Sequence, residues 1–106
     1  MSNQFVSVSI TKKANVHYDG HSISHLILLE DGTKKTLGVI LPTDKVLTFK
    51  AHVPELIEII SGKCTVQIGD ESEVKIYSSG ESFYIPGNCQ FRIITNEIID
   101  YICHLG

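Results

Sequence analysis

The sequence predicts an all-β protein, a single antiparallel β-barrel of about ten short strands. β-branched residues recur at every second position along much of the chain, which is the repeat of a strand with one buried face. Turn dipeptides such as Asp31-Gly32 interrupt these segments about every eight to twelve residues, a spacing typical of β-sandwiches and barrels. No segment is long enough for a stable helix. Closing the strands into a barrel would remove exposed strand edges.

The predicted strands follow one another through short turns. They cover residues 5–10, 14–18, 22–29, 35–41, 45–49, 55–60, 63–68, 74–77, 82–85, 90–95 and 98–104. The first strand alternates Phe-Val-Ser-Val-Ser-Ile, and the second is a short extended piece that ends at the Asp19-Gly20 turn. The third and fourth form a hairpin through Asp31-Gly32, and Pro42 ends the fourth.

Proline and glycine delimit the central strands. Pro54 follows the strand at 45–49 and favours a bend over residues 52–54, because it disfavours helix for the residue before it. Residues 55–60 have a partly helical arrangement of apolar side chains, but Ser61-Gly62 ends the segment at once, so a strand is predicted. Residues 63–68 alternate clearly, residues 69–72 form a turn, and four strands complete the chain.

The composition indicates one domain and excludes several functions. The 106 residues suffice for one modest core, so we expect a single domain over residues 1–106. The net charge is −3 and no basic run exceeds Lys34-Lys35, so we expect no nucleic-acid partner. The apolar runs are too short to span a bilayer and the first residues do not resemble a secretory signal. We therefore expect a cytoplasmic protein with no membrane partner.

The chain has three cysteines, Cys64, Cys89 and Cys103. An odd number without a signal sequence argues against a disulfide framework, and their spacings match no zinc motif. We expect all three to be small side chains buried on strands.

Two glycine-containing motifs stand in the central part of the chain. Glu55 precedes Gly62 by seven positions, and Gly80 precedes Pro86 by six. These spacings resemble the two sequence motifs of the cupin barrels, so the resemblance implies a cupin-like barrel of the jelly-roll type.

The residues at the metal positions of these motifs are of the wrong type. The positions upstream of the glutamate hold Phe49, Lys50 and Ala51 with a lone His52, and Phe91 stands where a third histidine is expected. A cation site needs three or four converging N, O or S ligands, and one histidine with one carboxylate does not supply them. We therefore expect no metal.

The whole chain resembles the pyrimidine/purine nucleoside phosphorylase family of small single-domain cupins. The resemblance covers nearly all of residues 15–104 and rests on the order and spacing of short pieces. These are Tyr18-Asp19-Gly20, Ser24, residues 31–42, Phe49, Pro54-Glu55, Ser61-Gly62, residues 80–83, Ile85-Pro86, Phe91 and Tyr101-Ile102-Cys103. The sequence departs from the family at His21, where a lysine is usual, at His25, and in lacking an aromatic residue before Tyr77.

This resemblance implies a broad-specificity pentosyltransferase. Members of the family split purine and pyrimidine nucleosides with inorganic phosphate and release a free base and a pentose 1-phosphate. The resemblance further implies a homodimer that needs no metal or organic cofactor, with phosphate as the co-substrate.

Such a reaction requires a phosphate ligand, a group that holds the ribose and a surface for the base, because the sugar becomes oxocarbenium-like. Glu55 is the candidate for holding the ribose or stabilising its charge, although it could equally be a solvated turn residue. Lys35 is the phosphate candidate, although it could be a solvated hairpin lysine. Arg92 is an alternative, but period-two alternation places it on the opposite face from Phe91.

The remaining candidates are aromatic residues and histidines. Phe49, Phe91 and Tyr101 could stack against the base, or they could be ordinary core residues. His21 and His52 could donate to phosphate or base, or they could have no part in the site.

Two other classes of function remain open. One is a non-catalytic small-molecule-binding cupin, and the other is a metal-dependent sugar-modifying cupin. A cupin fold alone would not separate them, because that fold supports many functions.

Overall fold

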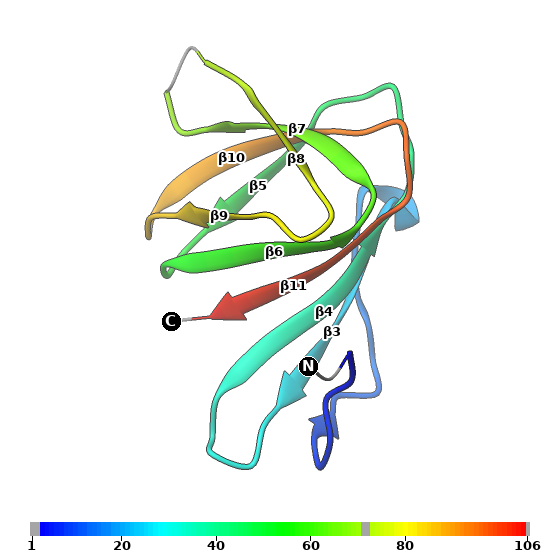
Figure 1. Cartoon of the computed structure of the whole chain (residues 1–106), viewed down its shortest axis with the longest axis vertical. Coiled ribbons are helices and arrows are strands. Elements are labelled where there is room, and N and C mark those ends of the chain that lie inside the picture. Colours follow the sequence, from blue (N-terminus) through cyan, green and yellow to red (C-terminus); the bar gives the residue numbers. More distant parts are fainter. Residues whose placement is uncertain (1–2, 71–72, 106) are drawn as a thin grey trace.

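The chain folds into two antiparallel β-sheets (Figure 1). The computed structural model describes residues 3–70 and 73–105. Its strands are β1 (Ser9–Ile10), β2 (Asn15–His17), β3 (Ser22–Leu28), β4 (Lys34–Ile40), β5 (Leu47–Ala51), β6 (Glu55–Ser61), β7 (Lys63–Ile68), β8 (Lys75–Ser78), β9 (Ser82–Ile85), β10 (Cys89–Ile94) and β11 (Ile99–Leu105). The larger sheet has the order β1-β3-β4-β11-β6-β9, with β2 beside β3, and the smaller has the order β5-β10-β7-β8.

The all-β antiparallel prediction is confirmed. The apolar side chains of residues 55–60 have a partly helix-like spacing in the sequence. These residues nevertheless lie within β6, because β11 and β9 pair with its two edges. Within the described parts of the chain, the helical structure is one 3₁₀ turn, η1 (Tyr18–Gly20). No helix in these parts is long and apolar enough to cross a membrane.

The N-terminal strand is shorter than predicted. Of the predicted segment 5–10, only Ser9–Ile10 pairs with β3. Ser7 has a φ of 56°, in the left-handed region, which an extended strand cannot include. At the predicted turn over residues 69–72, Glu71 and Ser72 lie outside the described residues.

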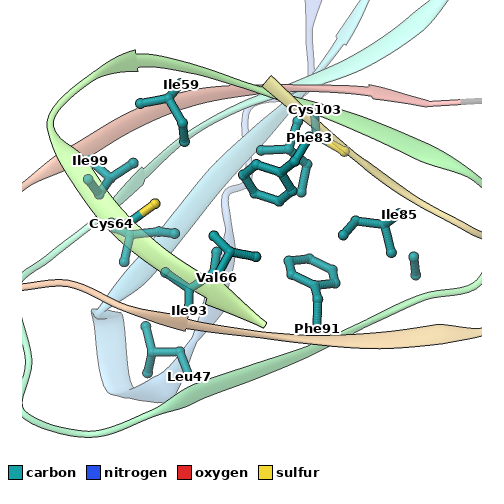
Figure 2. Packing of buried hydrophobic residues seen from close by; sticks show 13 residues of the cluster. Leu47, Ile59, Cys64, Val66, Phe83, Ile85, Phe91, Ile93, Ile99 and Cys103 are labelled. Atoms are coloured by element: carbon teal, nitrogen blue, oxygen red, sulfur yellow. The ribbon is translucent and has the colours of Figure 1, made fainter. Parts of the chain in front are cut away.

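The hydrophobic core lies between the two sheets. Figure 2 shows Phe83 of β9 and Phe91 of β10 directed toward one another, and their ring centroids are 6.5 Å apart. Ile59 and Ile99 come from the larger sheet and Val66 from the smaller, and all are almost completely buried. Period-two alternation thus places one face of each sheet in a shared core.

The predicted closure into one jelly-roll barrel stays a prediction, because the described strands pair as two separate sheets. The chain passes from one sheet to the other at Gly62, between β6 and β7. The cysteine prediction is confirmed for Cys64 and Cys103, which are free and buried, while Cys89 is half-buried.

Candidate active site

A cavity of about 140 Å³ lies between the inner faces of the two sheets. Strands β3, β4, β6 and β11 contribute hydroxyl, carboxyl and thiol groups, β5 and β10 contribute Phe49, Lys50 and Phe91, and β2 contributes His17. The polar and aromatic lining residues are His17, Ser22, Ser24, Thr36, Phe49, Lys50, Glu55, Phe91, Tyr101 and Cys103. We call this cavity the inner pocket.

Glu55 is the carboxylate of the inner pocket. It begins β6 and shares the inner face of this strand with the buried Ile57. Cys103 of β11 is the cross-strand partner of Ile57, so it lies diagonal to Glu55 on the same face. Its Sγ donates a hydrogen bond to Glu55 Oε1 over 3.0 Å. Burial, followed by the contact with Glu55, raises the pKa of the Cys103 thiol, which therefore keeps its proton and orients the carboxylate.

The Tyr101 ring packs over Gly38 of the neighbouring strand β4, because Gly38 has no side chain in that space. Gly38 of β4 is the cross-strand partner of both Tyr101 of β11 and Ser24 of β3. Burial raises the pKa of the Tyr101 phenol, and hydrogen bonds with Ser22 and Ser24 act in the opposite direction with smaller effect. The phenol is therefore neutral at physiological pH and can donate a hydrogen bond within the pocket.

The aromatic wall of the pocket comes from the smaller sheet. Phe49 of β5 and Phe91 of β10 are directly paired across the strands, and their rings stack with centroids 5.4 Å apart at 22°. Tyr18 packs edge-on against Phe49 with centroids 5.7 Å apart. Such a wall offers a flat apolar surface to a planar ring.

The structure brings four of the predicted site residues together, namely Glu55, Phe49, Phe91 and Tyr101. It does not bring Lys35 to them. The Lys35 ammonium lies on the outer face of the larger sheet and donates a hydrogen bond to His104 Nδ1 over 2.6 Å. His104 Nε2 in turn donates to Glu58 Oε1 over 3.0 Å.

The two predicted histidines and Arg92 also lie outside the inner pocket. The His21 ring donates from Nδ1 to the Tyr18 carbonyl over 2.9 Å. His52 lines a second hollow beside the pocket. Arg92 alternates with Phe91 and Ile93, both buried, and so faces away from the core, as the sequence predicts.

Several lining residues were not predicted, among them Ser22, Thr36 and His17. Ser22 and Ser24 are buried polar residues at alternate positions of one strand. That spacing is a usable sequence signal, because polar residues on a core-facing strand face need partners there. No comparable signal marks His17, which reaches the pocket only because β2 runs beside β3.

Gly38→Ala is expected to destabilise the fold by displacing Tyr101. An added Cβ would lie 2.6 Å from the Tyr101 Cζ, so the ring would have to shift, and its hydrogen bonds with Ser22 and Ser24 oppose that shift. Overpacking of this kind costs about 1–3 kcal/mol, which urea unfolding would measure.

A double-mutant cycle checks the cause. In a Tyr101→Leu background, Gly38→Ala should cost clearly less, because the clashing ring is absent. An equal loss of stability from Gly38→Ala in both backgrounds would show that the Tyr101 ring is not its cause.

The described residues contain no group of three or more His, Cys, Asp or Glu side chains arranged to hold a metal ion. The pocket instead sets one carboxylate and several hydroxyls opposite a stacked aromatic pair. It can hold a polyhydroxylated group on one side and a planar ring on the other.

Comparison with known sequences points in the same direction. The family profile described as "Pyrimidine/purine nucleoside phosphorylase" matches residues 12–105. Curated proteins of that name include one from Acinetobacter baumannii (strain ATCC 17978), 57% identical over 98% of this chain and 96% of its own length. Another, from Dechloromonas aromatica, is 49% identical over 98% of this chain and 99% of its own.

Solved structures share the fold. A protein of unknown function (DUF1255) from Acinetobacter sp. ADP1 aligns with a TM-score of 0.96 and 56% identity over 99% of this chain and 100% of its own. A protein of unknown function from Vibrio parahaemolyticus aligns with a TM-score of 0.80 and 31% identity, over 91% and 97%. The Fe(II) enzyme HppE aligns at 0.72 with 10% identity, over 89% and 55%, which is a likeness of fold alone.

Proposed function

The chain belongs to the pyrimidine/purine nucleoside phosphorylase family, and from this premise we propose that it is a broad-specificity pentosyltransferase. It cleaves purine and pyrimidine nucleosides with inorganic phosphate and yields the free base and ribose or deoxyribose 1-phosphate. The observation that supports this most directly is the inner pocket, where the Glu55 carboxylate and the stacked pair Phe49 and Phe91 lie on opposing sheets.

The two walls of the pocket match the two parts of a nucleoside. The base stacks on Phe49 and Phe91, because a planar heterocycle gains contact area and favourable ring geometry there. The ribose hydroxyls bond to Glu55, whose orientation the Cys103 thiol fixes. The neutral Tyr101 phenol supplies a further donor on the polar wall.

The reaction transfers the pentosyl group. A phosphate oxygen bonds to C1′ while the C1′–N bond breaks, and that bond's electron pair leaves with the base nitrogen. The nitrogen gains the proton that the phosphate loses, so charge and atoms balance. Positive charge develops on the sugar in between, and the Glu55 carboxylate stabilises it more strongly in the transition state than in the bound nucleoside.

In this proposal the enzyme works in the cytoplasm, uses no metal or organic cofactor, and has phosphate as co-substrate. Its two sheets belong to a cupin-like barrel of the jelly-roll type. A metal-dependent sugar-modifying reaction would need a ligand set, and no such group is present among residues 3–70 and 73–105. A non-catalytic binding protein could use the same pocket, so activity must be measured.

The test is incubation of the purified protein with inosine or uridine, with and without phosphate. We expect base release only when phosphate is present, together with an equal amount of pentose 1-phosphate. Base release without phosphate would indicate hydrolysis. Saturable nucleoside binding without any base release would indicate the non-catalytic binding protein.

We also propose that the protein is a homodimer joined through the outer face of its larger sheet. Leu37 of β4 and Leu56 and Ile60 of β6 alternate with inward-facing residues and stay more than a third exposed. These residues lie on the same face of β4 and β6, the strands on either side of β11, and form an apolar surface suited to a second copy. Light scattering should give about twice the 11.8 kDa mass of one chain.

A matched pair of variants locates the interface. Leu37→Asp should shift the mass toward one chain, because it places a charge in the apolar surface. Ile76→Asp on β8 changes a still more exposed residue of the smaller sheet and should leave the mass unchanged. A stable monomer of the unaltered protein at micromolar concentration would contradict the dimer.

A further inference from the structure

A second hollow of about 500 Å³ adjoins the inner pocket at its opening. Its lining residues are His17, Tyr18, Thr48, Phe49, Lys50 and His52. Three of them, His17, Phe49 and Lys50, line the inner pocket as well, so the two hollows adjoin at these residues. We call the second hollow the outer pocket.

The two pockets differ in their acidic groups, while Lys50 and His17 line both. The inner pocket contains the Glu55 carboxylate, whereas no acidic residue is among those that line the outer pocket. The outer pocket is lined by Lys50, an exposed residue that alternates with Phe49 and Ala51 on β5, and by His17 and His52. An ammonium with flanking N–H donors binds a phosphate dianion through charge-assisted hydrogen bonds.

The wall of the outer pocket is held in place by tertiary contacts. The Thr48 backbone N–H donates to the Tyr18 hydroxyl over 2.8 Å, and this hydroxyl in turn donates to the Thr48 carbonyl. These bonds attach η1 to β5, so His17 and Lys50 stand on segments that are fixed to one another. Tyr18 and Asp19 both have a φ of 54°, a left-handed conformation that the surrounding contacts must maintain.

We propose that Lys50, His17 and His52 form the phosphate subsite of the enzyme. This assignment rests on the proposed phosphorolysis and replaces Lys35 as the phosphate ligand. The phosphate sits in the outer pocket and meets C1′ of the nucleoside at the opening between the pockets, next to Phe49. In this position the cations attract the phosphate without neutralising Glu55, which lines the inner pocket and not the outer one.

Lys50→Gln tests the subsite, and Lys35→Gln is its matched control. Both are lysines on strands, but Lys35 bonds to His104 on the outer face of the larger sheet. Lys50→Gln should raise the KM for phosphate about tenfold or more, the size expected for losing a hydrogen bond to a charged group. The nucleoside KM should change by less than about twofold. Lys50→Arg should keep most of the phosphate affinity, and Lys35→Gln should leave both constants unchanged.

His17→Gln and His52→Gln supply a second comparison. Each should raise the phosphate KM by less than Lys50→Gln does, because each removes a donor and not a permanent charge. An unchanged phosphate KM in the Lys50 variant and in both histidine variants would overturn the assignment.

Titration with inorganic phosphate, followed by ³¹P NMR without nucleoside, separates this proposal from the proposed function. If no nucleoside is cleaved, the proposed function fails, while saturable phosphate binding that Lys50→Gln weakens would still support the subsite. If cleavage requires phosphate but Lys50→Gln changes neither phosphate binding nor its KM, the subsite fails and the function stands.

The same chemistry would suit the 5′-phosphate of a nucleotide. AMP and UMP are therefore tested as ligands of the unaltered protein and of Lys50→Gln. The co-substrate assignment predicts that inorganic phosphate competes with neither adenosine nor uridine. A subsite for the 5′-phosphate of a nucleotide would give three results together. AMP would bind more tightly than adenosine, Lys50→Gln would abolish that difference, and Lys50→Gln would leave the KM for inorganic phosphate unchanged. This combination would overturn the co-substrate assignment.

Discussion

Glu55→Gln is expected to lower kcat for nucleoside phosphorolysis roughly a hundredfold or more, the loss typical of deleting one electrostatic stabiliser. The amide keeps the size of the side chain and part of its hydrogen bonding but removes the charge that faces the sugar. Because that charge acts mainly in the transition state, the nucleoside KM should change much less. Steady-state kinetics with inosine and uridine at saturating phosphate would measure both constants.

Glu58→Gln is the matched control for this effect. Glu58 is the next carboxylate of β6, but it faces outward and accepts from His104 Nε2. It should therefore keep kcat within about twofold of the unaltered enzyme. A Glu55→Gln protein that is folded, dimeric and fully active on every nucleoside tried would show that Glu55 is structural. The proposed reaction would then keep the support of the family and of the Phe49 and Phe91 pair, without that of the Glu55 carboxylate.

Gly62→Ala is expected to cause the largest loss of stability, roughly 2–5 kcal/mol. Gly62 has a φ of 93° at the point where β6 leaves the larger sheet and β7 enters the smaller one. An added Cβ would lie 2.4 Å from the Ile98 carbonyl oxygen and 2.7 Å from Ile99 Cδ1. Because the closest atom belongs to the backbone, relief requires moving the chain just before β11. Urea unfolding monitored by circular dichroism would measure the change.

Gly80→Ala separates the two causes of this loss. Gly80 has a similar φ of 88°, but an added Cβ there meets no atom within 4 Å. Its variant should show only the cost of the left-handed backbone, about 1–2 kcal/mol. Equal losses in the two variants would mean that the contact with Ile98 contributes nothing.

The inner pocket was predictable in part because its residues carry local signals. Glu55 precedes the Gly62 turn by seven positions in the sequence. Phe49, Phe91 and Tyr101 are large rings in segments where apolar and polar residues alternate. Alternation shows which residues of one strand share a face with one another. It does not show that Cys103 reaches Glu55, since 48 positions separate the two residues.

The phosphate ligand shows where such signals fail. On β4, Lys35, Leu37 and Val39 occupy one face and Thr36, Gly38 and Ile40 the other. Both faces carry apolar side chains, so alternation cannot tell which one faces the core. The family resemblance favoured Lys35, because it belongs to a matching segment, whereas the structure places its ammonium on the outer face of the larger sheet. The phosphate subsite proposed above uses Lys50 instead.

Apart from the shortened first strand, the strands and turns could be predicted because they depend on residue spacing within short segments, and the family could be predicted from the order of such segments along the chain. The position of the last strand, β11, between β4 and β6 could not be predicted and is seen in the folded structure, as Figure 1 shows. The backbone hydrogen bonds that join these strands are the same for any residue, so alternation does not name the partner of a strand. That pairing places Tyr101 over Gly38 and Cys103 beside Glu55, and so it builds the polar wall of the pocket.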